Sequence, residues 1–381
     1  MDLRAAIVGN GEQGGYHARA YQDVPGVNLV AVCDVVPERA EAFARTYGLA
    51  EGAAFGSISK LLAHHQIDLW SICTPTAAHA PNTLEILREQ RPPLGILCEK
   101  PPCMNMMEFH SMTTQAKRLG VVLTFGFHLR YTAADWLARV IRAGHLGEVY
   151  HVDGMWHRRA GTPLRGVFTQ QRYAGGGPGM DLLPHVLDLA YLLVGREVVP
   201  AAVTASAHTR LAEQGGSGRN FDPSLSDVED TIIGHVKMAS PDGVTVTFAA
   251  SWEGHIDQDR LTVEVRGTAG GARLDLMRTN GTEFFVPRIY TQLEGEAVEA
   301  SISHPERFRT VEQCYAAEIA DLVNAVRCRN TSNGPGPTPQ ITTQQAAVVM
   351  NTIFAAYESA ASGETVALLP DAGLAEVQAI A

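Results

Sequence analysis

Short apolar runs alternate with amphipathic stretches along the first third of the chain. The apolar runs predict strands at residues 5–8, 27–33, 69–73, 95–98 and 121–125, with a shorter strand near Ala54. The stretches between them carry apolar residues at helical spacing and predict helices at residues 15–22, 37–47, 57–65, 80–88 and 105–119. Strands that alternate with helices form parallel sheets with right-handed crossovers. We therefore expect an α/β domain over residues 1–125.

The pattern changes after residue 125. Short runs in which apolar and polar residues alternate predict strands at residues 149–156, 203–207, 231–238, 244–252, 260–266 and 272–276. Helical patterns occur around residues 180–188, at 311–327 and at 342–362. Residues 208–227, with a Gly-rich segment at 214–218, lack periodicity and form either a mobile loop over a site or an exposed insertion. The run of short strands supports one sheet domain over residues 126–381.

The composition is that of a soluble globular protein, with 45% hydrophobic and 19% charged residues among 381. A net charge of -11 argues against nucleic acid or an anionic membrane as a partner. Six cysteines without a C-x-x-C pair are typical of reduced core residues in a cytosolic protein. The first apolar run is too short for a signal peptide, and no run reaches membrane-spanning length. We expect a cytoplasmic protein.

The first predicted strand is followed by a glycine-rich segment and then by a helix. This segment reads Gly9-Asn10-Gly11-Glu12-Gln13-Gly14, the G-x-G-x-x-G order of a dinucleotide site. The second strand ends at Asp34, 20 residues after Gly14, where a carboxylate can bind the adenosine ribose hydroxyls. Asp34 would repel a 2′-phosphate and Val35 supplies no cation, so we expect NAD rather than NADP, although Arg39 is near in sequence.

Polar residues follow two further strands of the predicted parallel sheet. Thr74-Pro75-Thr76 and His79 follow the fourth strand, and Cys98-Glu99-Lys100-Pro101 ends the fifth. Open α/β sheets bind ligands at this edge. Lys100 either points at such a ligand or caps a strand end at the surface. His79 either lies against the ribose or nicotinamide of the cofactor, or begins a helix and faces water.

In the second half, Asp181 and His185 are four residues apart in the predicted helix. This spacing places them on one helical face, where a carboxylate and an imidazole suit proton transfer. The alternative is an aspartate that favours the helix dipole and a structural histidine. Pro184 lies between them; if it breaks the helix, the common face is lost.

Several motifs together resemble the glucose-fructose oxidoreductase, inositol dehydrogenase and MocA (Gfo/Idh/MocA) family. They are the glycine-rich segment, Glu99-Lys100-Pro101, Gly126-Phe127-His128-Leu129-Arg130, Gly144-His145-Leu146-Gly147-Glu148-Val149, and Gly176 and Gly177 with Asp181 and His185. The likeness runs from about residue 4 to about residue 368. The sequence departs at His128, where members usually carry asparagine, and at Leu183, where glycine is usual.

The resemblance implies a Rossmann domain followed by an α+β domain with a mostly antiparallel open sheet, whose exposed face commonly mediates assembly into a homodimer or homotetramer. It implies that Lys100 and His185 flank the reacting carbinol while Asp181 helps to hold it. The predicted cofactor-binding residues are Gly9, Asn10, Gly11, Gln13, Gly14, Asp34, Thr74, Pro75, His79, Glu99 and Lys100. The predicted substrate-binding residues are Lys100, His128, Trp156, Arg159, Arg172, Asp181 and His185. For Trp156, Arg159 and Arg172, a strand near a dimer face would give the same pattern.

With these features, the resemblance implies an NAD-dependent dehydrogenase that oxidises a secondary hydroxyl of a sugar, glycoside, amino sugar or cyclitol. Ring carbon 3 is one candidate position, and an aminoglycoside is one candidate substrate. His185 would act as general base, and Lys100 would stabilise the developing alkoxide. No metal is expected, since the histidines and cysteines lack zinc-ligand spacing. The alternatives are an NAD-dependent glycoside hydrolase, an aldose-coupled oxidoreductase and a non-catalytic NAD(P)-sensing regulator.

Overall fold

A computed structural model describes residues 2–163, 167–195, 197–210, 226–241, 243–302, 308–331 and 338–368. The predicted Gly-rich segment at 214–218 lies outside the described residues. Contacts divide the chain into two compact units. The N-terminal unit comprises Met1–His128 and Glu312–Gln344, and the C-terminal unit comprises Leu129–Val311 and the described residues from Gln345 on. The structure thus differs from the predicted division at residue 125, because residues 312–344 return to the first unit.

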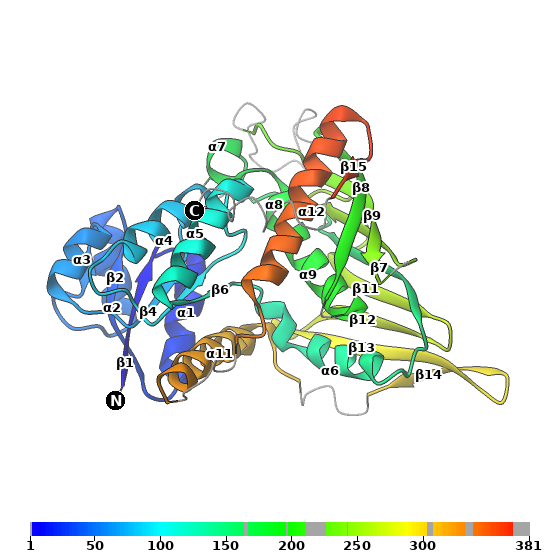
Figure 1. Ribbon diagram of the computed structural model, residues 1–381, viewed down its shortest axis with the longest axis horizontal. Coiled ribbons are helices and arrows are strands. Elements are labelled where there is room, and N and C mark those ends of the chain that lie inside the picture. Colours follow the sequence, from blue (N-terminus) through cyan, green and yellow to red (C-terminus); the bar gives the residue numbers. More distant parts are fainter. Residues whose placement is uncertain are drawn as a thin grey trace. The chain divides into compact units, whose positions relative to one another are not determined.

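The N-terminal unit is built on a six-stranded parallel sheet with the strand order β3-β2-β1-β4-β5-β6. Figure 1 labels β1, β2, β4 and β6 of this sheet. Its strands are β1 (Leu3–Val8), β2 (Val27–Cys33), β3 (Ala54–Phe55), β4 (Leu69–Ile72), β5 (Gly95–Cys98) and β6 (Val122–Phe125). The crossover helices are α1 (Glu12–Asp23), α2 (Pro37–Thr46), α3 (Ile58–His64), α4 (His79–Leu87) and α5 (Met106–Leu119), with a 3-10 turn, η1 (Thr76–Ala78), before α4. This strand order is that of a Rossmann fold and confirms the predicted fold class.

Local sequence explains where the helices of this unit begin and end. The Ser57 hydroxyl accepts from the Lys60 amide at the start of α3, and the Asn105 side chain accepts from the Glu108 amide at the start of α5. Gly120 ends α5 in the left-handed conformation, at φ 70°. Strands β4, β5 and β6 are buried at every residue, as expected for a parallel sheet covered on both faces.

Helix α11 (Val311–Thr331) completes the core of the N-terminal unit. Its residues Ile319, Leu322 and Val326 are buried in one cluster with Leu3 and Ile7 of β1. Gly95 at the start of β5 lies against α11, because a Cβ there would be 2.9 Å from the Leu322 Cδ1 atom. The amphipathic pattern of residues 311–327 predicts this helix but does not indicate which core receives its apolar face.

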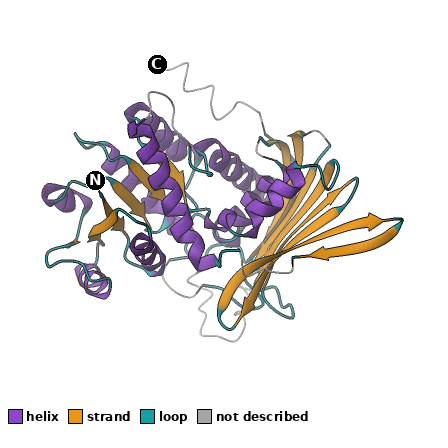
Figure 2. Ribbon diagram, turned by 90° about the horizontal axis from the view of Figure 1, so that it is seen from below, coloured by secondary structure: helices purple, strands orange, loops and turns teal. Residues whose placement is uncertain are grey.

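The C-terminal unit is built on a nine-stranded sheet with the order β14-β13-β12-β11-β7-β10-β9-β8-β15. Figure 2 draws its strands as long orange arrows. Its strands are β7 (Val149–His157), β8 (Val199–His208), β9 (Thr231–Ser240), β10 (Thr245–Ser251), β11 (Arg260–Gly267), β12 (Gly271–Thr279), β13 (Thr282–Leu293), β14 (Glu296–Ser301) and β15 (Val366–Ala367). All neighbouring strands are antiparallel except β7 and β10. The mostly antiparallel sheet is confirmed.

Helices of the C-terminal unit cover one face of this sheet. They are α6 (Ala133–Arg142), α7 (Gln171–Ala174), α8 (Pro178–Asp181), α9 (Leu183–Val194) and α12 (Thr343–Ser362), preceded by the 3-10 turn η2 (His128–Tyr131). Every residue of α9 is buried. Gly154 of β7 allows α9 to approach closely, since a Cβ there would lie 2.8 Å from the Val186 Cγ1 atom.

The prediction of a single helix around Asp181 and His185 is wrong, because the structure has two helices there. The amide of Leu182 donates to Pro178 O and the amide of His185 donates to Leu182 O, while Pro184 has no amide hydrogen to donate. The chain therefore forms two helices that meet at Leu182. Asp181 ends α8 and His185 lies in the first turn of α9, so separate helices position them.

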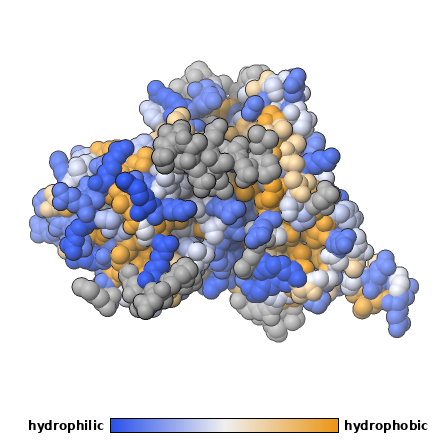
Figure 3. All heavy atoms as spheres, in the orientation of Figure 1, coloured by the Kyte–Doolittle hydropathy of each residue, from blue (hydrophilic) through white to orange (hydrophobic). Residues whose placement is uncertain are grey.

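Hydrophilic side chains, with hydrophobic ones between them, cover much of the face shown in Figure 3. This mixture is ordinary for a protein surface. None of the helices in the described part of the chain combines the length and apolar character needed to cross a bilayer.

Candidate active site

The glycine-rich turn packs tightly at two positions and is open at a third. Gly9 has φ +92°, and a Cβ there would lie 2.6 Å from the Cys73 carbonyl carbon. A Cβ at Gly14 would collide with the Gly9 carbonyl oxygen. Gly11, by contrast, would direct a Cβ into space with no atom within 4 Å. The turn thus lies against the end of β4 and leaves room for a ligand at Gly11.

Asp34 closes this turn from the end of β2. Its carboxylate accepts from the Asn10 amide at 2.9 Å and from the Val36 amide at 3.0 Å. The Arg39 guanidinium lies 3.6 Å from Asp34 Oδ2 and is half exposed. Asp34 therefore has the position expected of a ribose-binding carboxylate, with remaining acceptor capacity on both oxygens.

The residues of the turn fit a bound dinucleotide. Among the described residues, neither the amide oxygen nor the amide nitrogen of the buried Asn10 side chain has a hydrogen-bond partner. Buried polar groups are normally paired, so these two atoms indicate a ligand beside Gly11. The N-terminus of α1, the positive end of its helix dipole, lies at the same turn and favours a pyrophosphate.

Lys100 emerges at the carboxyl end of β5, on the same sheet edge as the glycine-rich turn, and Glu99 holds its backbone. The Lys100 amide donates to Glu99 Oε2 at 3.1 Å. Gly126 lies directly against the Glu99 carboxylate, since a Cβ there would be 2.7 Å from Glu99 Cδ. The Gly126 amide also donates to Cys98 O at 2.9 Å. The lysine is therefore mounted on a fixed loop.

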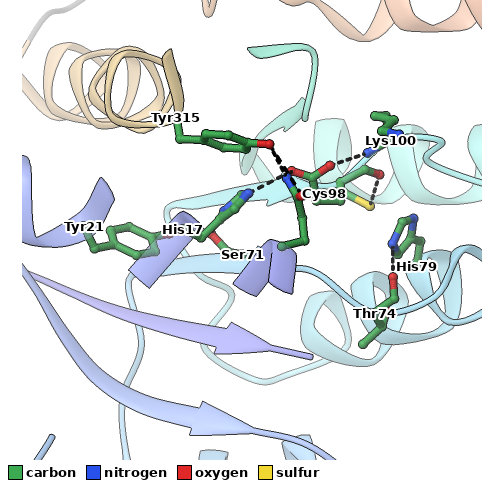
Figure 4. A network of polar contacts seen from close by, with 10 residues as sticks. His17, Tyr21, Ser71, Thr74, His79, Cys98, Lys100 and Tyr315 are labelled. Atoms are coloured by element: carbon green, nitrogen blue, oxygen red, sulfur yellow. Dashed lines mark hydrogen bonds and ion pairs between the residues drawn. The ribbon is translucent and has the colours of Figure 1, made fainter. Parts of the chain in front are cut away.

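The Glu99 carboxylate is the centre of a buried polar network. Figure 4 labels its neighbours His17, Lys100 and Tyr315. His17 Nε2 and Gln13 Nε2 both lie 2.8 Å from Glu99 Oε1, and Gln13 also contacts the Tyr315 hydroxyl. Burial raises the pKa of Glu99, but the hydrogen bond and charge of His17, with smaller effects of His128 and Lys100, bring it down to about 2. Glu99 is therefore ionised near neutral pH.

His79 begins α4, but its ring does not face water. The side chain is buried, and Nδ1 lies 2.8 Å from Pro101 O while Nε2 lies 2.6 Å from Thr74 O. Burial lowers the pKa of His79, although both backbone contacts oppose this, so the neutral ring donates to one carbonyl at a time. The water-facing alternative is wrong, and the ring connects the segments after β4 and β5.

His128 is buried in the N-terminal unit, with its ring stacked on Tyr315 at a centroid distance of 4.1 Å. Burial lowers the pKa of His128 to about 3; the Glu99 carboxylate opposes this shift, and the charges of Lys100 and His17 add to it. The ring is therefore neutral near neutral pH.

In the C-terminal unit, Asp181 is positioned by two side chains that the sequence patterns did not single out. Trp252 Nε1 donates to Asp181 Oδ2 at 3.0 Å, and Arg158 Nη2 lies 3.4 Å from the same oxygen. The Arg158 guanidinium also covers the Trp156 ring at 5.7 Å. Trp156 in turn lies 5.8 Å from the His185 ring. These residues form one cluster of aromatic rings, a cation, a carboxylate and an imidazole.

Two arginines predicted for this cluster make other contacts. The Arg159 guanidinium donates to Asp257 O and its amide donates to Asp259 Oδ1. Arg172 donates to Gln170 Oε1 and covers the Tyr173 ring. The neighbour of Arg159 in sequence, Arg158, takes the place next to Asp181.

The cysteines are all free thiols, and Cys328 alone of the six is not buried. No group of three or more His, Cys, Asp or Glu side chains in the described ranges is arranged to hold a metal ion.

Comparison with known proteins gives matches along most of the chain. A sequence profile described as "Oxidoreductase family, NAD-binding Rossmann fold" matches residues 3–127, and one described as "GFO/IDH/MocA C-terminal domain" matches residues 135–273. The D-glucoside 3-dehydrogenase of Escherichia coli (strain K12) is 29% identical over 373 residues, which cover 96% of this chain and 97% of that protein. The inositol 2-dehydrogenase of Rhizobium meliloti (strain 1021) is 28% identical over 327 residues, which cover 86% of this chain and 89% of that protein.

Solved structures share the fold of the whole described chain. Levoglucosan dehydrogenase in complex with NADH and L-sorbose aligns with a TM-score of 0.81 and 20% sequence identity, covering 97% of this chain and 100% of that one. At this identity the likeness establishes the arrangement of elements and leaves the substrate to other evidence.

Proposed function

Because the chain belongs to the Gfo/Idh/MocA family of NAD-binding oxidoreductases, we propose that it is an NAD-dependent dehydrogenase that oxidises a secondary hydroxyl of a sugar, glycoside, amino sugar or cyclitol. The observation that carries the proposal is the place of Lys100. It follows β5 at the same sheet edge as the glycine-rich turn, on a loop fixed by Glu99. A cation at this edge suits an alcohol that becomes an alkoxide.

The bound NAD would accept hydride at its nicotinamide ring, and the protein would supply geometry and proton handling. Gly11 and Asn10 would face the pyrophosphate, and Asp34 would accept hydrogen bonds from the adenosine ribose. His79 would act indirectly, by holding the Thr74 and Pro101 segments together.

Three side chains would handle the substrate hydroxyl. His185 would take its proton as general base, and Lys100 would donate a hydrogen bond to the oxygen as negative charge develops there. Asp181, held by Trp252 and Arg158, would orient the substrate. The Trp156 ring offers an apolar plane of the kind that packs against a sugar ring.

Two observations support finer candidates for the substrate. The similarity to a D-glucoside 3-dehydrogenase supports oxidation at ring carbon 3. An aminoglycoside is a further candidate, since the chain carries a net charge of -11. The free, mostly buried thiols support a reducing, cytoplasmic setting. We also propose a homodimer or homotetramer.

The experiment is to mix purified protein with NAD or NADP and a panel of glycosides, amino sugars, aminoglycosides and inositols, and to follow NADH absorbance. We expect NADH formation with NAD and one class of substrate. Absence of NADH with every substrate would contradict the proposal. Glycoside cleavage without NADH, or turnover that requires two sugars, would instead identify a hydrolase or an aldose-coupled enzyme.

A further inference from the structure

His17 is fully buried and contacts Glu99 from within the first crossover helix. It lies in α1, three residues after Gly14, with 0% of its surface exposed. Its Nδ1 lies 2.9 Å from Ser71 Oγ on β4, and Ser71 Oγ lies 2.9 Å from the Tyr21 hydroxyl. Its Nε2 lies 2.8 Å from Glu99 Oε1 (Figure 4). An imidazole with both nitrogens in fixed contacts has a single orientation.

The direction of the contact with Glu99 follows from the charge of the carboxylate. An ionised carboxylate only accepts hydrogen bonds, so His17 Nε2 carries the proton and donates it to Oε1. The other oxygen, Oε2, accepts from the Lys100 amide. One side chain thus connects α1 with the backbone of the residue that would stabilise the alkoxide.

Other groups face the carboxylate from each surrounding element. They are Gln13 and His17 of α1, His128 after β6, Tyr315 of α11, and Lys100 itself, with Glu318 of α11 adding charge near Tyr315. His128 is neutral, and Tyr315 and Gln13 are uncharged. In this surrounding, His17 makes the largest contribution that favours the ionised form of Glu99.

We propose that His17 is a positioning residue for Lys100: by its hydrogen bond it keeps the Glu99 carboxylate ionised and in the place where it binds the Lys100 backbone. The inference rests on the proposed role of Lys100. Without His17, only Gln13 would still donate to Oε1, so the buried carboxylate would take up a proton at a higher pH. A protonated carboxyl group is a weaker acceptor for the Lys100 amide. Small displacements of a group that acts on the reacting atoms lower the rate strongly.

A matched pair of variants distinguishes the contact made by His17 Nε2 from the contact made by Nδ1. In His17→Gln the side-chain amide can reach the position of Nε2 and donate to Glu99, whereas in His17→Asn it can reach only the position of Nδ1 near Ser71. We expect His17→Asn to lower kcat by about 10²-fold with a nearly unchanged KM for NAD. In the pH profile of kcat for this variant, the acidic limb should move to higher pH. His17→Gln should restore most of kcat. Tyr21→Phe, at the far end of the same chain of contacts, should behave like the wild type.

Glu99→Gln tests the same link without a cavity. It should lower kcat to a similar extent, and combining it with His17→Asn should add little, since both act through one contact. Equal kcat in His17→Asn and His17→Gln, or wild-type kcat in Glu99→Gln, would overturn the inference. A Lys100→Ala variant that keeps wild-type activity would overturn the proposed function together with it.

Infrared spectroscopy of the protein without substrate provides a readout that does not depend on turnover. At pH 5 the wild type should lack a buried carboxylic-acid band for Glu99, whose pKa is about 2. His17→Asn should show such a band, and Glu99→Gln in the same background should remove it. If the wild type oxidises no sugar, this band still tests whether His17 keeps Glu99 ionised. Absence of the band from His17→Asn at every pH would overturn that role of His17.

Discussion

At the scale of single residues, the chemistry proposed for Lys100 makes a sharp prediction. Replacing Lys100 with alanine removes the donor to the developing alkoxide, so kcat should fall by about 10²- to 10³-fold. The NAD affinity should change little, because the glycine-rich turn and Asp34 are untouched. Stopped-flow kinetics and NAD titration measure the two effects separately. Lys117→Ala, at an exposed lysine of α5, is the control and should leave both kcat and NAD affinity unchanged.

The preference for NAD depends on Asp34, which lies at the end of β2. In Asp34→Ala, the lost charged acceptor should weaken NAD binding by about 10- to 100-fold, since hydrogen bonds to charged groups contribute about 1.5–3 kcal/mol. The affinity for NADP should fall less or rise, because a negative charge near the 2′-phosphate is removed and Arg39 is then released from its contact with Asp34. Calorimetric titration with both nucleotides tests this. An equal loss for both would remove the case for a ribose contact, and Glu38→Ala on α2 is the matched exposed control.

Residue-level reading of the sequence identified spacing better than orientation. The glycine-rich segment, Asp34 and Lys100 were predicted because each follows a strand whose carboxyl end must lie at one sheet edge. The sequence does not show that Arg158 rather than Arg159 lies next to Asp181, since this depends on where β7 ends and which face the next residue takes. His17 was missed because a histidine inside a helix pattern gives no indication of the carboxylate that it meets 82 residues later.

At the scale of elements, the turn between β1 and α1 should respond differently at two glycines. Gly14→Ala places a methyl group against the Gly9 carbonyl oxygen and should lower the free energy of unfolding by about 1–3 kcal/mol. Gly11→Ala meets no atom within 4 Å and has φ -87°, so stability should change by about 1 kcal/mol or less. Its NAD affinity should nevertheless fall by about tenfold or more, because the methyl group occupies the ligand's approach.

Thermal unfolding and NAD titration of both variants test this pair. Unchanged NAD affinity in Gly11→Ala would show that the cofactor does not approach the turn there. Gly56→Ala, at an exposed glycine outside the turn where an added Cβ also meets no atom within 4 Å, serves as the matched control for Gly11→Ala.

The strands and helices of the N-terminal unit were largely predictable because apolar and amphipathic segments alternate without interruption. The C-terminal unit was less so. The hairpin of β13 and β14 was missed, since β14 is mostly exposed and has almost no apolar pattern. The break between α8 and α9 depends on the missing amide hydrogen of Pro184. The sequence shows this proline, but the helical spacing of the apolar residues around it still predicts one helix.

At the scale of the molecule, each unit contains a buried carboxylate with a shifted pKa, and the two shifts have opposite effects on stability as the pH falls. The pKa of Glu99 in the N-terminal unit is about 2, below its usual 4.5. Such a group stabilises the fold above pH 4.5, and this contribution is lost as the pH falls from 4.5 toward 2. In the C-terminal unit, burial raises the pKa of Glu229 above 4.5, although hydrogen bonds from Gly177, Tyr357 and Gly179 oppose the shift. The ionised form of Glu229 therefore costs stability, and its protonation on acidification relieves that cost.

The two signs predict that the N-terminal unit loses stability relative to the C-terminal unit as the pH falls from 4.5 to 2. Hydrogen exchange measured by mass spectrometry, with peptides assigned to each unit, should show earlier loss of protection in β1, β4 and β5 than in β7, β10 and β11. Glu99→Gln should flatten this dependence in the N-terminal unit, and Glu229→Gln should remove the gain of the C-terminal unit above pH 4.5. If the C-terminal strands exchange first, or if Glu99→Gln leaves the acid dependence unchanged, the buried His17 and Glu99 contact does not hold the carboxylate ionised, and both the stability argument and the proposed support of Lys100 fail together.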